Sequence, residues 1–421
     1  MTVRVMIVCA LAVTLVACGT GQSVDADEAG APDASAEAGS AGIASGGDAG
    51  AAPVQASGGA DFDAPDLPSE FQGQSPPGRA GSEFSTDFSR ATVSFEEVMS
   101  GGPPKDGIPS IDEPTFVEID AADSWLSADE SVLVVTAGSG AGAQTHIYPV
   151  QILMWHEIVN DTVGGLPVSV TYCPLCNTGI AFDRRFDGEI MDFGTTGRLR
   201  YSNLIMYDRQ TETWWQQATG RAIAGRYAGG RLEMVPMLML SWSDATAEYP
   251  DARVLSRQTG HNRSYGRNPY AGYDTASQPF LYRGPTDDEF SPMTRVVTVF
   301  HDDASEAFAY PTLREERVLT ATIGGADVAV FWEPGTASPL DTRSTADGRD
   351  VGTANAFFAR ADGRALQFTT EGDAIVDAET GSTWDVTGRA VSGPLDGTRL
   401  EPVTTSQHFW FSWVAFEDES G

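Results

Sequence analysis

The sequence predicts an α+β fold rich in β-strands, built from two tandem copies of one short-strand unit packed as one globular body. Two observations point to this class. Short runs that alternate β-branched with polar residues are bounded by glycine, proline and asparagine, which is typical of strands and turns. A long stretch of the chain also occurs twice. Each copy is expected to place one helix before its core strand.

The repeat is clearest where residues 219–225 (TGRAIAG) recur as residues 387–393 (TGRAVSG). Further matches in the same order are Asp208 with Asp377, Trp215 with Trp384, Arg231-Leu232-Glu233 with Arg399-Leu400-Glu401, and Trp242 with Trp410. Glycines at such points serve turns and tryptophans fill cores, so we attribute the shared set to the fold. The alternative is a ligand groove between the halves, lined by arginine and tryptophan.

The domain limits follow from the repeat. We expect a duplicated domain at 93–421, with copy one at about 108–255 and copy two at about 290–418. The stretch between them, about 256–289, is rich in Gly, Tyr, Asn and Pro and reads as a long ordered connector.

The N-terminus predicts export. Arg4 precedes an apolar run at residues 5–16 that is too short to span a bilayer. The run ends in Leu15-Val16-Ala17-Cys18, which resembles the lipobox of bacterial lipoproteins and implies a signal peptide at 1–18 and a lipid on Cys18. An ordinary secretory peptide cut nearby is the alternative. Residues 19–92 are acidic and rich in Ala, Gly, Ser and Pro, which predicts a disordered tether.

Within copy one, the elements can be placed in order. Residues 132–136 form a short apolar strand, and residues 148–159 repeat apolar side chains at helical spacing after Pro149. Residues 168–173 alternate like a strand. Residues 180–186 and 190–193 flank Asp187-Gly188, the signature of a hairpin. Residues 204–207 form a further strand.

The charge excludes one class of partner. The formal net charge is −33, and Lys105 is the only lysine. Such a surface repels phosphate backbones, so we expect no nucleic-acid binding.

The sulfur chemistry lies at the end of the core strand, in Cys173-Pro174-Leu175-Cys176. Copy two has Glu333-Pro334-Gly335-Thr336 at the corresponding place, so the unit folds without the cysteines. Two cysteines at this spacing can form a local disulfide, cycle as a redox pair or hold a soft metal. If the site is redox-active, Cys173 and Cys176 are its catalytic thiols.

The helix before the core strand carries His156, which has no counterpart in copy two. Packing of the helix on the strand is expected to bring its imidazole near Cys173 and Cys176. Such a cluster suits copper or zinc, with a water, Met154 or another histidine completing the shell. A buried or capping histidine is the alternative.

Other polar side chains take secondary places. Tyr172 and Asn177 flank the cysteines, while Glu157 and Asp161 can orient the imidazole, act as a base or face solvent. The remaining histidines, of which His261 is the best outside candidate for a ligand, show no metal spacing: His146, His261, His301 and His408.

Several motifs carry a resemblance. They are residues 155–161 (WHEIVND), 170–177 (VTYCPLCN), 206–211 (MYDRQT), 268–273 (NPYAGY) and 279–281 (PFL). Over nearly all of 105–418 the chain resembles a prokaryotic family catalogued as domain of unknown function 3179. The resemblance implies the domain limits and export, and it implies no activity.

The sequence therefore predicts an extracytoplasmic lipoprotein, anchored to the cell membrane or outer membrane through Cys18. Its expected feature is a metal-binding or thiol-redox site at the Cys-Pro-Leu-Cys motif, and whether it is an enzyme stays open. One alternative is a small-molecule or glycan binding module with a structural disulfide. Another is an inert cell-surface scaffold. The identity of a small-molecule or protein partner is open as well.

Overall fold

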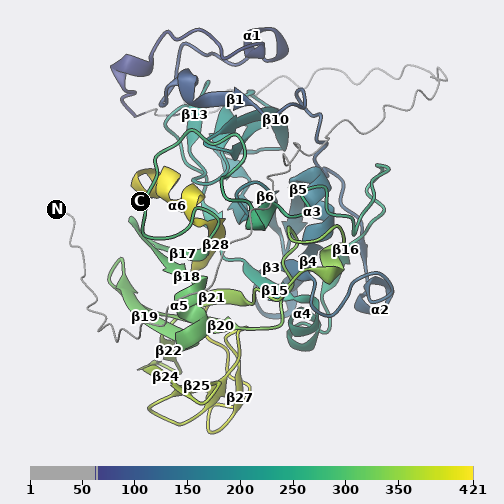
Figure 1. Cartoon of the computed structure of the whole chain (residues 1–421), viewed down its shortest axis with the longest axis vertical. Helices are drawn as coiled ribbons and strands as arrows, with labels where there is room; N and C mark the ends of the chain where they lie inside the picture. Colours follow the sequence, from purple (N-terminus) through teal and green to yellow (C-terminus); the bar gives the residue numbers. More distant parts are fainter. Residues whose placement is uncertain (1–61, 63–64, 421) are drawn as a thin grey trace, which may run out of the picture. The chain divides into compact units, whose positions relative to one another are not determined.

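The computed structural model describes residue 62 and residues 65–420, which fold as a β-rich α+β protein with few helices (Figure 1). This confirms the predicted fold class in its coarse form. The signal peptide at 1–18, Cys18 and most of the expected tether lie outside the described residues. None of the described helices is long and apolar enough to cross a membrane.

A central seven-stranded sheet contains the core strand β6. Its order is β18-β17-β28-β7-β6-β5, with β14 paired to β7. The bounds are β5 Ile158–Val163, β6 Leu166–Cys173, β7 Thr178–Asp183, β14 Met234–Val235, β17 Arg295–His301, β18 Ala304–Ala309 and β28 Thr404–Phe409. The sheet joins distant parts of the chain, because Gln407 on β28 lies opposite Gly179 on β7.

A second contact, between Asn355 and Met239, also joins distant parts of the chain. One sheet has the order β15-β3-β4-β16-β2, and another has β19-β20-β21. The bounds are β2 Phe116–Val117, β3 Ser131–Ala137, β4 Gln144–Pro149, β15 Leu238–Ser241, β16 Arg253–Leu255, β19 Val318–Ile323, β20 Ala326–Glu333 and β21 Thr353–Phe358. The Asn355 side chain on β21 donates to the Met239 carbonyl of β15 at 2.9 Å and accepts the Met239 amide at 3.1 Å.

The remaining strands form two larger sheets and two small hairpins. The larger sheets are β1-β10-β11-β12-β13 and β24-β25-β26-β27, and the hairpins are β8-β9 and β22-β23. The bounds are β1 Val98–Ser100, β8 Arg185–Phe186, β9 Glu189–Ile190, β10 Phe193–Arg200, β11 Asn203–Asp208, β12 Trp214–Gln216, β13 Ala222–Ala224, β22 Arg360–Ala361, β23 Arg364–Ala365, β24 Phe368–Glu371, β25 Ala374–Asp377, β26 Thr383–Trp384 and β27 Ala390–Ser392.

The helices of the described residues are short. The α-helices are α1 Ala80–Glu83, α2 Ile119–Ala122, α3 Val150–His156, α4 Trp242–Glu248, α5 Tyr310–Glu316 and α6 Trp410–Phe416. The 3₁₀ helices are η1 Ser69–Phe71, η2 Phe95–Glu97, η3 Gly140–Gly142, η4 Tyr273–Thr275, η5 Thr345–Asp347 and η6 Glu417–Glu419. Apart from η4, the connector at 256–289 has no regular structure.

The helix predicted at 148–159 is shorter than expected. Residues before Val150 belong to β4, and α3 ends at His156 because Glu157 adopts the left-handed conformation, with φ 58°. The chain then runs directly into β5. The Leu153 carbonyl accepts the Glu157 amide, which closes the helix. Arg317 occupies the same place after α5, with φ 64°.

The predicted boundary of the tether at residue 92 is wrong. Phe84 and Phe88 are buried, and their rings lie 5.3 and 4.9 Å from the ring of Trp214 in edge-on contacts. These aromatic residues supply apolar area that the Ala- and Gly-rich composition around them conceals. The folded part therefore includes residues well before Ala91.

The two aspartates matched by sequence make the same contacts. Asp208 accepts hydrogen bonds from the Trp215 indole at 2.9 Å and from the Thr211 amide at 2.6 Å. Asp377 accepts them from the Trp384 indole at 2.9 Å and from the amide of Thr380 at 2.6 Å. Both carboxylates therefore serve to hold a turn against a tryptophan.

The matched arginines hold helix ends. Arg389 and Arg399 both pair with buried Glu248, the last residue of α4. Near the C-terminus, the matched Arg231 donates to the Ser420 carbonyl at 2.9 Å. Arg200, which belongs to no matched pair, forms an ion pair with Glu419 at 2.7 Å.

The Arg221 guanidinium also donates, to the Glu419 carbonyl at 2.7 Å. These arginines are therefore engaged within the protein.

Candidate functional site: a buried dithiol

The turn between β6 and β7 positions both cysteines. Cys173 ends β6 opposite Thr178, the first residue of β7, and the Cys176 amide donates to the Cys173 carbonyl at 3.2 Å. Asn177 closes the turn in the left-handed conformation, with φ 51°, which asparagine tolerates. Both cysteines are free, with 1% and 0% of their surface exposed. The alternative with a structural disulfide does not match this structure.

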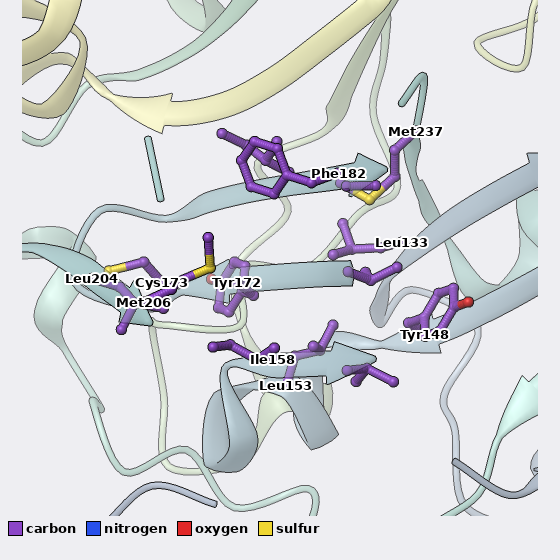
Figure 2. Packing of buried hydrophobic residues seen from close by; sticks show 14 of the residues in the cluster. Leu133, Tyr148, Leu153, Ile158, Tyr172, Cys173, Phe182, Leu204, Met206 and Met237 are labelled. Atoms are coloured by element: carbon purple, nitrogen blue, oxygen red, sulfur yellow. The ribbon is translucent and has the colours of Figure 1, made fainter. Parts of the chain in front are cut away.

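The sulfur of Cys173 lies among backbone groups and apolar side chains. It is 3.8 Å from the Ser202 carbonyl oxygen, and Figure 2 shows the cysteine near Leu204 and Met206. Burial raises the pKa of the Cys173 thiol well above its ordinary value, and the neighbouring Cys176 side chain raises it further. The amides of Leu204 and Cys176 act against this rise. The thiol is therefore protonated at neutral pH.

Glu157 carries a carboxyl close enough to this thiol to feel its charge. Its position is fixed by the backbone, because the Tyr172 amide donates to the Glu157 carbonyl at 2.8 Å. Burial raises the pKa of Glu157 well above its ordinary value, and the charge of Cys173 is the second cause. Within residues 65–420, its carboxyl forms no hydrogen bond or ion pair. It can accept or release a proton beside the dithiol.

Aromatic residues of the connector close the site. Tyr270, Tyr273 and Tyr282 all pack against the core cluster that contains both cysteines. Tyr273 also contacts Phe409 at a ring distance of 6.2 Å, and the Phe409 amide donates to the Cys176 carbonyl at 2.9 Å. The dithiol thus lies between the end of β28 and the connector.

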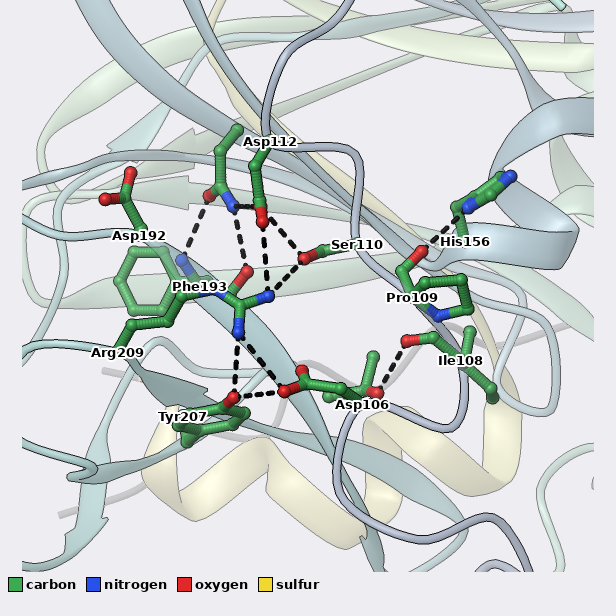
Figure 3. A network of polar contacts seen from close by, with 12 residues as sticks. Asp106, Ile108, Pro109, Ser110, Asp112, His156, Asp192, Phe193, Tyr207 and Arg209 are labelled. Atoms are coloured by element: carbon green, nitrogen blue, oxygen red, sulfur yellow. Dashed lines mark hydrogen bonds and ion pairs between the residues drawn. The ribbon is translucent and has the colours of Figure 1, made fainter. Parts of the chain in front are cut away.

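His156 lies beside other partners. Its Nδ1 is 2.7 Å from the Pro109 carbonyl oxygen (Figure 3), and its Nε2 is 2.6 Å from the Tyr265 hydroxyl. A carbonyl oxygen can only accept, so Nδ1 carries the proton and Nε2 accepts from Tyr265. Burial lowers the pKa of His156 to about 4. The imidazole is neutral and both nitrogens are engaged, so it does not supply the expected third ligand.

The other candidate residues have structural partners. Asp161 accepts from the Tyr148 hydroxyl at 2.6 Å and pairs with His146 at 2.7 Å, so it does not orient His156. The Tyr172 hydroxyl donates to Asn177 Oδ1 at 3.0 Å, which braces the cysteine turn.

A neighbouring network explains another motif. Arg209 pairs with Asp106 and Asp112, both at 3.2 Å, and the Tyr207 hydroxyl donates to Asp106 (Figure 3). Asn160 donates to Asp112 at 2.7 Å. Together with His156, these residues fasten the segment at 106–112 to the core.

The described residues form no cluster of side chains that could surround a metal ion. Among residue 62 and residues 65–420, no group of three or more His, Cys, Asp and Glu side chains is arranged to hold one. The two thiols stand with Glu157 rather than with an imidazole. The site therefore consists of a buried dithiol with a buried carboxyl close to it.

Sequence reasoning missed Ser202 and the connector tyrosines as parts of the site. No sequence pattern marks Ser202, because its position beside Cys173 depends on a turn in which Ser202 itself has φ 67°. Tyr270 and Tyr273 stand in the NPYAGY motif that contributed to the resemblance, which was the available signal.

These observations define a class of protein: a β-rich α+β protein with a buried, reduced Cys-x-x-Cys turn beneath an aromatic connector. The chain belongs to the family described as "Protein of unknown function (DUF3179)", whose model matches residues 105–420. No curated protein and no solved structure matches the chain.

Proposed function

We propose that Cys173 and Cys176 form a thiol-redox centre. The observation that carries the proposal is the pair of free thiols in one turn, with the Glu157 carboxyl beside them and engaged by no other group in the part of the chain that the structure describes. A buried carboxyl next to a thiol is placed to take its proton when the thiol reacts.

The chemistry is thiol–disulfide exchange. Glu157 first releases its own proton to solvent, the Cys173 proton passes to the resulting carboxylate, and the thiolate attacks one sulfur of a substrate disulfide. The Cys173–substrate bond forms as the substrate S–S bond breaks, and the leaving thiolate takes up a proton. Cys176 then loses its proton and attacks the Cys173 sulfur, the bond between Cys173 and the substrate breaks, and the second substrate sulfur leaves as a thiolate that takes up a proton. The products are a Cys173–Cys176 disulfide and two substrate thiols, so the protein loses two electrons and the substrate gains them.

The internal comparison supports this assignment. We infer that the folded part consists of two copies of one unit, since α3-β5-β6 and α5-β19-β20 occur in the same order and the two aspartate turns share their contacts. Copy two replaces Cys173 by Glu333 and Glu157 by Arg317. Residues that only copy one carries are therefore the candidates for chemistry.

The cellular setting belongs to the same proposal. A signal peptide at 1–18 and a lipid on Cys18 would place the dithiol outside the cytoplasm, held to a membrane. Mass spectrometry of the N-terminal peptide tests this, because a diacylglyceryl group on Cys18 is expected.

The redox proposal is tested by equilibrating the full chain, in detergent, with glutathione buffers over a range of potentials. Mass spectrometry after alkylation then gives the oxidised fraction of the peptide containing Cys173 and Cys176. A reversible two-electron transition is expected, and Cys173→Ser and Cys176→Ser should each abolish it. Thiols that stay reduced at every potential would refute the proposal.

Metal analysis of the same samples tests the second candidate function, which is metal binding. A metal site at Cys173 and Cys176 predicts copper or zinc in a one-to-one ratio that is lost in both serine variants.

A further inference from the structure

The dithiol cannot react in the arrangement described. Exchange requires a sulfur of the substrate to reach bonding distance of Cys173, yet that side chain has 1% of its surface exposed. Part of the protein must therefore move before the reaction. The connector is the part that closes the site, so its attachments decide which portion can move.

The first half of the connector is firmly fixed. The carboxylate of Asp274 is fully buried and pairs with Arg295 at 3.2 Å and Arg349 at 3.0 Å. Asn268 adds a backbone hydrogen bond of 2.8 Å to the Arg343 carbonyl. Buried ion pairs of this kind are costly to break.

The next portion, residues 276–290, is held less strongly, and we call it the cover. Most of its residues are exposed or half-buried, and Phe280 has 40% of its surface exposed. Beyond the cover, Pro292 and Thr294 are fixed again, since their carbonyl groups accept the amides of Phe411 and Trp410. The cover can therefore move between two anchored points.

Two contacts place the cover directly over the thiols. The Ser202 hydroxyl donates to the Phe280 carbonyl at 2.5 Å, while the Ser202 carbonyl is the group 3.8 Å from Cys173. The Tyr282 ring lies 4.9 Å from the ring of Phe411. Its hydroxyl donates to the Pro285 carbonyl within the cover and lies 3.2 Å from the Phe411 carbonyl oxygen. The Tyr282 side chain carries no charge.

A largely apolar hollow lies beside the cover, and one of the residues that line it has a buried donor without a partner among the described residues. A small hollow lies between the cover and α6, lined chiefly by Pro279, Tyr282, Pro292, Trp410, Phe411 and Val414. Trp410 has 8% of its surface exposed, and its indole Nε1 has no hydrogen-bond partner among the described residues. A buried indole donor without a partner favours a ligand that brings a carbonyl oxygen.

We propose that the cover occupies the place of the substrate, and that a disulfide-bonded polypeptide segment with apolar side chains displaces it. This inference rests on the proposed redox function. Tyr282 shows the chemistry that the site accepts, because its aromatic ring packs on Phe411. The net charge of −33 repels small anionic disulfides such as oxidised glutathione, which leaves apolar peptide disulfides as the better substrates.

The reaction is the exchange already described, with the peptide disulfide as the oxidant. The peptide S–S bond breaks, its two sulfurs leave as thiols, and Cys173 and Cys176 become joined. The Trp410 indole donates to a backbone carbonyl of the peptide and holds it in place. That indole is a positioning group and takes no part in the electron transfer.

The cover is tested with Tyr282→Ala and a matched control, Tyr249→Ala. Tyr249 is half-buried and packs against a different core cluster, which contains neither cysteine. The rate of alkylation of Cys173 and Cys176 by iodoacetamide in the folded full chain is measured by mass spectrometry. Tyr282→Ala is expected to raise it at least tenfold, and Tyr249→Ala less than twofold. Equal effects of the two variants, or no effect of Tyr282→Ala, would overturn the proposal that the cover shields the thiols.

The substrate class is tested with two peptides of the same length that each contain one internal disulfide. One carries Leu and Phe beside the cysteines, and the other carries Glu at those positions. The reduced full chain is expected to react at least tenfold faster with the apolar peptide, and equal rates would overturn this assignment. If neither peptide nor oxidised glutathione reacts while alkylation behaves as expected, the redox function fails and the cover stands.

Discussion

The hydroxyl of Tyr265 lies 2.6 Å from Nε2 of His156, and Nδ1 of the same ring lies 2.7 Å from the Pro109 carbonyl oxygen. One imidazole therefore joins the segment before β2, helix α3 and the connector. Nε2 also lies 3.5 Å from the Thr259 hydroxyl of the connector, so both nitrogens are engaged and the ring acts as a fastener between three parts of the chain.

Replacing this fastener should cost stability without changing the redox chemistry. We expect His156→Ala to lower the free energy of unfolding by about 2–4 kcal/mol, because two hydrogen bonds are lost and the Pro109 carbonyl is left unpaired. Urea unfolding measures the loss, and the half-buried His301 provides a control whose replacement by Ala costs less. A shift in the redox midpoint of the dithiol would contradict the assignment.

The same ring makes stability depend on pH. Burial lowers the pKa of His156 in the folded protein to about 4, below the ordinary 6.5, so the unfolded chain binds the proton first. The contribution is complete above pH 6.5 and is lost as the pH falls towards 4, with a maximum of about 3 kcal/mol. Urea unfolding at pH 7, 5.5 and 4 should show this loss, and His156→Gln should reduce it. Parallel curves for the two proteins would refute the prediction.

Glu157 should change the pH dependence of stability in the opposite direction. Burial raises its pKa in the folded protein, so the unfolded chain releases the proton first and stability falls as the pH rises above about 4.3. Glu157→Gln removes this dependence, so the variant should gain stability relative to the natural protein between pH 4.5 and 7. Thiol–disulfide exchange by the variant should be slower at least tenfold. A variant with unchanged exchange would exclude the carboxyl as the proton acceptor.

The glycines of the repeated Thr-Gly-Arg segments have a measurable role. A Cβ on Gly220, with φ 68°, would lie 2.9 Å from Phe182 Cε1, and one on Gly388, with φ 79°, would lie 2.4 Å from Phe357 Cε1. Gly325, with φ 80° and open space around it, isolates the backbone strain.

We expect replacement of Gly325 by alanine to cost about 1 kcal/mol in the free energy of unfolding. The corresponding changes at Gly220 and Gly388 should cost more, with Gly388→Ala the largest. Thermal unfolding measures all three. Equal losses would show that the close approach to the phenylalanine rings is unimportant.

The sequence predicted those parts of the site that depend on local pattern. The alternation of residues 168–173 and the Pro174 and Asn177 that follow placed both cysteines in a turn after a strand, as the structure has them. It could not predict the direction of His156, since that depends on the left-handed residue that ends α3.

Aromatic residues in irregular segments were harder to place. Phe84 stands in a stretch whose composition is typical of disorder, and Tyr282 stands in a connector without periodicity. Their burial depends on partners far away in the chain, Trp214 and Phe411, and no local pattern encodes such a contact.

The contacts between distant parts have a consequence for any break in the chain. β7 takes β28 as its neighbour in one sheet, and the Asn355 side chain on β21 bonds to the backbone of β15, so the two halves hold each other. A protease cut inside the cover should therefore yield two polypeptides that remain bound and elute together, and that separate only in denaturant. Produced alone, either fragment would have an unpaired strand edge, and Arg389 and Arg399 would be separated from Glu248. Production of both fragments together should restore the folded protein.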